Sequence, residues 1–323
     1  MDPAIIVFGL GIGLLVGMTG MGGGSLMTPL LIFIFGISPT TAIGTDIFYS
    51  AVTKTVGAWR HFRMKTVNMG MVRWLATGSV PGALIGVWVI SILKDHLGED
   101  QLDSVVYALL GGTLLMVGII QLTRALILSN LIEERDDFAI ERRHKISAVV
   151  IGATTGFVIG ITSAGSGTVI AILLIAVFRL TPRRVVGTDI FHAAILLWAA
   201  GLAHWLGGNV DFGLAGNILI GSVPGVIIGA ALSGRAPVGF LRTALGVVLT
   251  ASGIVTIQKG DPTVWPIAAL VAGIGLALII WAPRHYQRKR EERLAAEREQ
   301  RLAAELAQGP RDRSADLAPE AIG

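Results

Sequence analysis

The sequence predicts an all-α polytopic membrane protein with two inverted repeats, each containing a broken-helix hairpin, and a C-terminal cytoplasmic helix. Three observations lead to this prediction. Of the 323 residues, 53% are hydrophobic and 15% are charged, whereas soluble domains carry roughly 25% charged residues. Apolar runs recur along the chain, and most approach the ~20 residues that a membrane-spanning helix needs. In addition, the first half of the chain is similar in sequence to the second.

Two glycine-rich stretches interrupt the apolar runs. Residues 17–25 read GMTGMGGGS, and residues 160–168 read GITSAGSGT. We name them the first and second breaks, because consecutive glycines disfavour a helix by about 1 kcal/mol each relative to alanine. Unwound backbone inside a membrane requires burial by protein or access to water. Each break therefore predicts a site, and the short runs after them, 25–37 and 168–180, either span the membrane or re-enter it.

The internal repeat is long and has no gap. Residues 13–86 align with residues 156–229 at a constant offset of 143 positions, which is a strong indication of a duplicated unit. Identical positions include Pro39 with Pro182, His61 with His204, the GTDIF motifs that begin at 44 and 187, and the GSVPG motifs that begin at 78 and 221. Five apolar segments per copy is an odd number, so we expect the second copy to be inserted upside down. Inverted repeats of this kind are typical of secondary transporters.

Loop charges predict the orientation in the membrane. Basic residues alternate between loops in a pattern that places the N-terminus outside and the C-terminus in the cytoplasm. The first apolar run follows no Lys or Arg, which argues against a cleaved signal peptide. We therefore expect a multi-pass protein of the cell inner membrane.

These features divide the chain into five parts. They are a first transmembrane repeat (1–129), a cytoplasmic linker (130–145), a second, inverted transmembrane repeat (146–258), an additional transmembrane helix (259–283), and a cytoplasmic helix with a disordered tail (284–323).

The helix that follows each break is the first candidate binding element. A helix start offers free N–H groups and a partial positive charge, which suit an anion. Inversion would bring the two starts toward each other near the middle of the bilayer, where they would clamp a small oxyanion. The alternative is that the glycines only let helices pack closely.

Two intramembrane acids are the second candidate. Asp46 and Asp189 lie seven residues after Pro39 and Pro182, which we expect at the first helical position after the N-caps Ser38 and Thr181. A carboxylate at this depth costs on the order of 3 kcal/mol. The acids either take part in proton coupling or bond backbone N–H groups at the break of the other repeat.

Other polar residues in the apolar runs have weaker assignments. Thr45 and Thr188 either donate to a ligand or bond carbonyls of their own helices. Lys54 neutralises an anionic substrate, pairs with Asp46, or extends to the cytoplasmic edge, and we expect the last. His61 and His204 are expected at helix ends near opposite interfaces, where they cap helices or line the surface.

Several kinds of chemistry are not predicted. The chain contains no cysteine, which excludes disulfides and thiol catalysis. It also lacks the spacing of a metal site, a phosphate loop or a catalytic triad. We therefore predict no cofactor, no metal and no enzymatic activity.

Several motifs of this chain resemble those of the sulfite exporter TauE/SafE family, also called the toluene-sulfonate uptake permease family. They are the two breaks, Pro39 with the Gly-Thr-Asp motif at 44–46, and the second copy of that motif at 182–189. The resemblance covers most of residues 4–283. It implies an inner-membrane transporter for sulfur-containing anions such as sulfite, sulfoacetate or other organosulfonates, with secondary and proton-linked transport. The second copy departs from the glycine-rich form at Ser163, Ala164 and Ser166.

The main hypothesis is thus a proton-coupled secondary transporter of a small sulfur-containing anion that works by alternating access. Its partners would be that anion and the lipid bilayer, with no nucleic acid, and a homo-oligomer is left open. The coupling or structural acids are Asp46 and Asp189. The predicted substrate-binding residues are Gly22, Gly23, Gly24, Ser25, Thr45, Gly165, Ser166, Gly167, Thr168 and Thr188.

Three alternatives remain open at this stage. One is a passive anion channel, which shares the fold. Another is a membrane-embedded enzyme that uses Asp46 and Asp189 in one cavity. A third is a scaffold that presents the helix at 284–308 to a partner.

Overall fold

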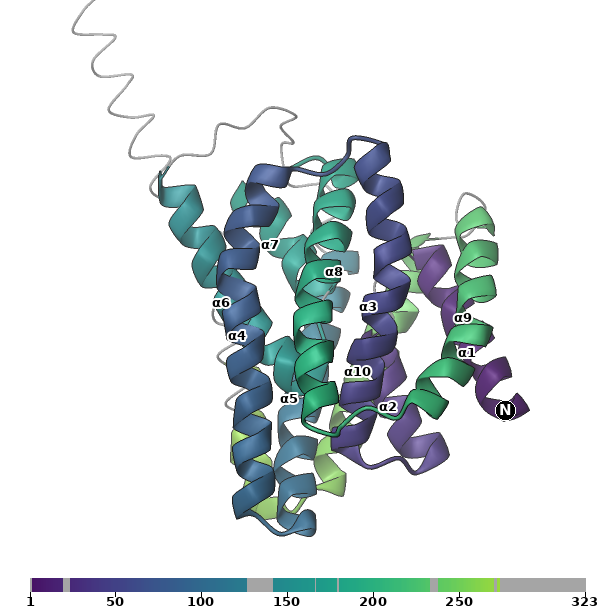
Figure 1. The fold of residues 1–323 in the computed structure, drawn as a ribbon, viewed down its shortest axis with the longest axis vertical. Coiled ribbons are helices and arrows are strands. Elements are labelled where there is room, and N and C mark those ends of the chain that lie inside the picture. Colours follow the sequence, from purple (N-terminus) through teal and green to yellow (C-terminus); the bar gives the residue numbers. More distant parts are fainter. Residues whose placement is uncertain are drawn as a thin grey trace, which may run out of the picture. The chain divides into compact units, whose positions relative to one another are not determined.

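The computed structural model describes residues 2–19, 24–126, 142–165, 167–178, 180–232, 238–269 and 272–273. This part of the chain is built from α-helices with short connections (Figure 1). The helices of the first half are α1 (Pro3–Thr19), α2 (Gly24–Phe35), α3 (Pro39–Arg63), α4 (Met69–His96) and α5 (Glu99–Leu126). Those of the second half are α6 (Arg142–Thr162), α7 (Thr168–Phe178), α8 (Pro182–Leu206), α9 (Phe212–Leu232) and α10 (Val238–Lys259), followed by the short 3-10 helix η1 (Pro262–Val264).

Several of these helices match the dimensions of a bilayer. By length and composition, five segments in the described residues can cross a membrane. They are Met69–His96, Glu99–Thr123, His144–Thr162, Arg183–Leu206 and Phe212–Gly229. Shorter apolar segments lie at Pro3–Met18, Ser25–Phe35 and Thr243–Lys259. The prediction of an all-α polytopic membrane protein is confirmed.

The two halves of the chain interlock. The most extensive helix contacts are α1 with α9, α4 with α6, α3 with α8, and α5 with α10, and each pair takes one helix from each half. In Figure 1, α3 and α8 run side by side, and α4 lies against α6. Neither half could therefore keep its packing without the other.

Glycines make the closest of these contacts, and they do so at corresponding positions. A Cβ atom added to Gly156 of α6 would overlap the backbone of Ser79 in α4. A Cβ atom added to Gly13 of α1 would overlap the backbone of Ser222 in α9. The second pair of residues lies 143 positions from the first. Small residues let membrane helices approach closely, so packing explains these glycines in the helices that lead into the breaks.

The helix starts agree with the predicted prolines and N-cap positions, but the N-cap residues form no capping hydrogen bond through their side chains. α3 and α8 begin at Pro39 and Pro182, yet neither Ser38 nor Thr181 caps its helix through the side chain. The Ser38 hydroxyl instead donates to Thr41 Oγ1 at 3.0 Å. The fixed φ of proline already favours the first turn and removes one N–H that would need a cap.

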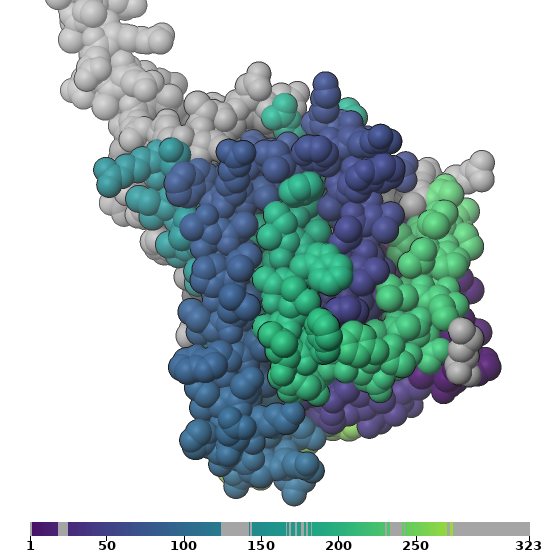
Figure 2. Space-filling model, viewed as in Figure 1, coloured from purple at the N-terminus to yellow at the C-terminus, as the bar shows by residue number. Residues whose placement is uncertain are grey.

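The side chains that face outward fit a lipid environment. Figure 2 shows one face of the molecule, over which α3, α4, α8 and α9 are visible. These helices carry exposed large apolar side chains, among them Val56, Trp88, Leu206 and Ile227. Exposure of so many large apolar side chains is expected for helices that contact lipid tails.

Candidate functional site

The second break lies outside helix at residues 163–165 and 167, and residues 20–23 of the first break fall outside the described residues. α1 ends at Thr19 and α2 begins at Gly24, while α6 ends at Thr162 and α7 begins at Thr168. Within the second break, Ser163 and Gly165 adopt left-handed backbone, with φ of 58° and 95°. Only glycine adopts this conformation without steric cost, so the backbone at Ser163 is held there by its surroundings.

The two breaks are in direct contact. The Gly165 N–H in the second break donates to Ser25 Oγ, the hydroxyl of the second residue of α2, at 3.0 Å. The Ser25 side chain is buried. Because Gly165 lies just before α7, the starts of the two half-helices approach the same point in the protein interior. The prediction that the breaks face each other is confirmed by this contact.

Asp46 lies beside this junction and is enclosed by three hydroxyl groups. Its Oδ2 accepts from Thr28 Oγ1 at 2.5 Å and from Ser163 Oγ at 2.8 Å. Its Oδ1 accepts from Ser50 Oγ at 3.2 Å. The three donors come from α2, α3 and the second break, and the Asp46 side chain is fully buried. We name Thr28, Ser50 and Ser163 the hydroxyl cage of Asp46.

The hydroxyl cage shows which groups bond one of the two intramembrane acids. The sequence left open whether each acid would bond the break of the other repeat, and Asp46 does so through Ser163. The donor is a side-chain hydroxyl, however, and not a backbone N–H. A buried carboxylate is costly unless it is hydrogen-bonded, so the cage makes the position of Asp46 tolerable.

Asp189 has different neighbours. The positions that correspond to Thr28 and Ser50 are Ala171 and Ala193, which have no hydroxyl group. Asp189 instead lies within electrostatic range of Lys54, which also interacts with Asp46. Both Asp189 and Lys54 are more than nine-tenths buried.

The expectation that Lys54 extends to the cytoplasmic edge is therefore wrong. Its side chain is 8% exposed and lies inside the protein near two carboxylates. Attraction to these buried charges, which water screens only weakly there, favours the inner position over hydration at the edge.

His192 extends the polar cluster on α8. Its Nε2 lies 2.7 Å from Ser79 Oγ in α4, its side chain is fully buried, and it lies within electrostatic range of Lys54. The residue that corresponds to His192 is Tyr49, which lies beside Ser222. Ser79 and Ser222, the serines of the two GSVPG motifs, thus face corresponding positions of α8 and α3. The helices that carry them, α4 and α9, continue through Pro81 and Pro224.

Thr45 and Thr188 also form a corresponding pair of contacts. Thr45 Oγ1 accepts the Asp211 N–H, and Thr188 Oγ1 accepts the Asn68 N–H, each at 3.0 Å. Asp211 and Asn68 in turn accept from the N–H groups of Leu214 and Met71 at the starts of α9 and α4. Both threonines are fully buried. Among the described residues, these two hydroxyl groups bond neither the carbonyl groups of their own helices nor the breaks, and their predicted role in substrate binding stays a prediction.

The remaining predicted site residues lie in the breaks. Gly22, Gly23 and Ser166 fall outside the described residues. Gly24 and Thr168 are the first residues of α2 and α7, and Gly167 is a half-buried turn residue just before α7. Their roles toward a substrate likewise stay predictions.

The two histidines at helix ends differ from each other. His204, in the last turn of α8, is fully buried, and its Nε2 lies 2.8 Å from the carbonyl oxygen of Gly160. The expectation of a surface position is wrong for His204, which ties the end of α8 to the beginning of the second break. His61 is half-buried, and its Nδ1 lies 2.9 Å from Thr66 Oγ1.

Sequence reasoning missed several residues around the acids. Thr28 and Ser50 were not predicted, although Ser50 lies four residues after Asp46 and therefore on the same helix face. Ser163 was noted only as a departure from the glycine-rich form. His192 follows Asp189 by three residues, a spacing that could have identified it. No local pattern connects Thr28 with Asp46, because only the packing of α2 on α3 brings them together.

Comparison with known proteins places the chain in a family. A family model described as sulfite exporter TauE/SafE matches residues 5–256. A probable membrane transporter protein of Bacillus subtilis (strain 168), YjnA, is 37% identical over 254 residues, which cover 79% of this chain and 99% of the relative. A second Bacillus subtilis protein with the same description, YdhB, is 26% identical over 75% of this chain and 95% of its own length.

A relative from another organism carries the same description. A probable membrane transporter protein of Methanocaldococcus jannaschii is 28% identical over 232 residues, or 70% of this chain and 80% of the relative. No solved structure matches. The family match extends from α1 into α10 and so includes both breaks, Asp46 and Asp189. The chain is therefore a multi-pass membrane transporter and not an enzyme, and it belongs to the sulfite exporter TauE/SafE family.

Proposed function

We propose that this protein is a secondary transporter that moves a small sulfur-containing anion, such as sulfite, sulfoacetate or another organosulfonate, together with protons by alternating access. The observation that carries the proposal is the contact between the breaks, Gly165 N–H to Ser25 Oγ. The first N–H groups of an α-helix have no partner within the helix and carry partial positive charge. Two helix starts at one buried point therefore supply donors for a negatively charged solute.

The substrate site would be formed by the breaks and the first residues of α2 and α7. These are Gly22, Gly23, Gly24, Ser25, Gly165, Ser166, Gly167 and Thr168. Thr45 and Thr188 already accept backbone N–H groups at the starts of α9 and α4. We therefore favour a packing role for these two threonines within the proposed mechanism.

The position of Asp46 supports coupling to protons. Ser163 belongs to the second break and also donates to Asp46. Two unit charges roughly 5 Å apart repel each other by about 3 kcal/mol at an effective dielectric constant of about 20. An anion at the breaks would therefore bind far better when Asp46 is protonated, so that the anion and the proton would bind together.

Corresponding contacts in the two halves support the inverted repeat. Thr45 with Asp211 and Thr188 with Asn68 form the same contact, and Gly13 with Ser222 repeats Gly156 with Ser79. A pseudo-twofold relation between the halves would account for all of them. In secondary transporters, such halves rock against each other around a central site.

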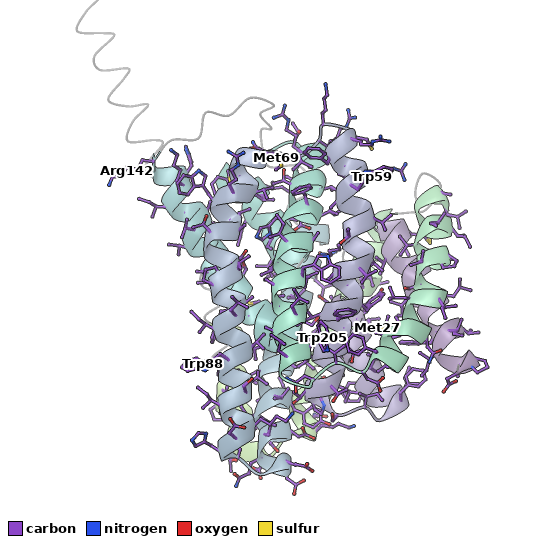
Figure 3. All side chains as sticks on the ribbon, viewed as in Figure 1. Met27, Trp59, Met69, Trp88, Arg142 and Trp205 are labelled. Carbon is purple, nitrogen blue, oxygen red and sulfur yellow. The ribbon has the colours of Figure 1, made fainter. Side chains whose placement is uncertain are left out.

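Charge distribution favours one orientation in the inner membrane. Trp59, Met69 and Arg142 lie near the same end of the helices (Figure 3). The basic residues Arg60, Arg63, Lys65, Arg73 and Lys145 are close to these three in sequence. Because cytoplasmic loops are enriched in Lys and Arg, we assign this end to the cytoplasm.

Transport in proteoliposomes tests the proposal. Purified protein would be assayed for uptake of labelled sulfite, sulfoacetate and toluenesulfonate, with and without a pH gradient, and with empty vesicles as the control. We expect saturable uptake of at least one of these anions that a pH gradient accelerates. Flux that neither saturates nor responds to the gradient would indicate a passive channel, and no flux of any sulfur anion would refute the proposal.

A further inference from the structure

We propose that the two intramembrane acids have separate roles: Asp189 forms a fixed ion pair with Lys54, and Asp46 is the acid that takes up and releases the coupled proton. This inference rests on the proposed proton-coupled transport. It goes beyond that function because it assigns different chemistry to two residues that occupy identical motifs.

Corresponding positions around the two acids hold different residues. Around Asp46, hydroxyl groups come from Thr28, Ser50 and Ser163. Around Asp189, the positions equivalent to Thr28 and Ser50 hold Ala171 and Ala193. The reverse holds for the cation, because Lys54 has Leu197 as its counterpart. Hydroxyl groups of both halves thus bond Asp46, whereas Asp189 has the Lys54 ammonium group of α3 within electrostatic range.

The hydroxyl and ammonium groups near the two acids differ in hydrogen-bonding capacity. A hydroxyl group can donate one hydrogen bond and can also accept, whereas an ammonium group only donates. The cage can therefore donate to an ionised Asp46 and accept from a protonated one after a rotation of one hydroxyl. An ammonium group such as that of Lys54 favours only the ionised form of a nearby carboxylate. Asp46 is thus the acid whose surroundings suit both protonation states.

Charge balance in the protein interior also separates the roles of the two acids. Asp46, Lys54, Asp189 and His192 are all more than nine-tenths buried. Lys54 lies within electrostatic range of both Asp189 and Asp46. A Lys54–Asp189 pair is neutral as a unit, which leaves the protonation of Asp46 to decide whether the cluster carries a net charge. The cluster is neutral when Asp46 holds a proton. This matters because a buried ion that lacks compensation is strongly unfavourable.

The titratable groups near Asp46 are few among the described residues. Lys54 and Tyr49 lie on α3 itself, and Asp189 and His192 lie on α8. α2 and α9 contain no charged residue, and the charged residues of α5 lie near its two ends. His192 already shares a hydrogen bond with Ser79. No other carboxylate in these helices lies at the depth of the hydroxyl cage.

A double-mutant cycle on stability tests the ion pair without any transport measurement. The variants are Lys54→Leu, which copies Leu197, Asp189→Asn, and both together, each followed by thermal unfolding of the purified full chain in detergent. We expect each single variant to lower the midpoint temperature of unfolding, because it leaves one buried charge uncompensated. The double variant should regain most of this loss in midpoint temperature. Additive losses in the double variant would refute the ion pair.

Proton movement during transport tests the role of Asp46. A pH-sensitive dye inside proteoliposomes would report protons that enter with a sulfur anion, while anion counterflow, which needs no net proton movement, would report a folded transporter. We expect Asp46→Asn to lose anion-driven proton entry and Asp46→Glu to keep it with a shifted pH profile. The matched control is the Lys54→Leu/Asp189→Asn double variant, which should keep proton entry.

The outcomes separate this inference from the proposed function. If the unmodified protein moves no protons with any sulfur anion, the proposed coupling itself fails. If the unmodified protein is coupled but Asp46→Asn remains coupled, or if the double variant has lost coupling, the assignment of the proton to Asp46 is wrong. If both Asp46 variants lack counterflow, proton entry in the Lys54→Leu/Asp189→Asn double variant still decides whether Asp189 or Asp46 carries the coupled proton.

Discussion

Removal of the Ser163 hydroxyl tests the junction between the second break and α3. In Ser163→Ala, Asp46 Oδ2 loses a donor at 2.8 Å and keeps Thr28 at 2.5 Å. Alanine retains the Cβ atom, so the left-handed backbone at this position, with φ of 58°, stays equally constrained. A hydrogen bond to a charged group contributes roughly 1.5–3 kcal/mol. Because this bond joins the break of the second half to the first half, its loss should also favour their separation.

The assay compares thermal unfolding and sulfur-anion uptake for Ser163→Ala and Ser50→Ala. Ser50 donates to the other oxygen of the same carboxylate at 3.2 Å, but it lies on the same helix as Asp46. We expect Ser163→Ala to lose about 1.5–3 kcal/mol of stability and to change the uptake rate, while Ser50→Ala changes both less. The loss should shrink at a pH where Asp46 is protonated, because hydrogen bonds to a neutral acid are weaker. A larger effect from Ser50→Ala, or equal stability of Ser163→Ala and the unmodified protein, would refute the reasoning.

Three further predictions test the packing, the threonines and the tail. Gly156→Val should prevent α4 and α6 from packing, since its Cβ atom would overlap the Ser79 backbone, and purified yield and the unfolding midpoint should fall sharply; Gly11→Val, where a Cβ atom meets nothing within 4 Å, is the control. Thr188→Val removes the acceptor of the Asn68 N–H and should cost about 1–3 kcal/mol of stability with an unchanged KM for the anion, whereas a raised KM would show that Thr188 contacts the substrate. Removal of residues 284–323 should leave anion uptake unchanged in proteoliposomes, and a complete loss of uptake would favour the scaffold alternative.

Much of the fold could be predicted because it depends on local properties of the sequence. Apolar runs of membrane-spanning length gave the helices, and Pro39 and Pro182 gave the starts of α3 and α8. Consecutive glycines and small residues gave the two breaks. The constant offset of 143 positions pairs these features in the sequence alone. Each of these conclusions needs only the covalent chain and the requirement that buried backbone groups be hydrogen-bonded.

The site was predicted less completely, because its contacts join residues far apart in the chain. Asp46 was identified as an acid in an apolar helix, but its bonds to Thr28 and Ser163 cross 18 and 117 positions. Lys54 was expected at the membrane edge, since a lysine near the end of an apolar run normally extends there. The sequence contained no sign that Asp189, on the opposite half, would lie close enough to keep it inside.

The sequence by itself determined that this chain is a multi-helical membrane protein with two glycine-rich interruptions and an acid in each copy of one motif. Composition, periodicity and backbone chemistry are sufficient for that, because they act within a few residues. Only the tertiary structure decided that the two interruptions touch through Gly165 and Ser25, and that the two acids have different partners. Helix packing sets these neighbours, and the free energy of a buried charge depends on the groups around it and not on the motif that carries it.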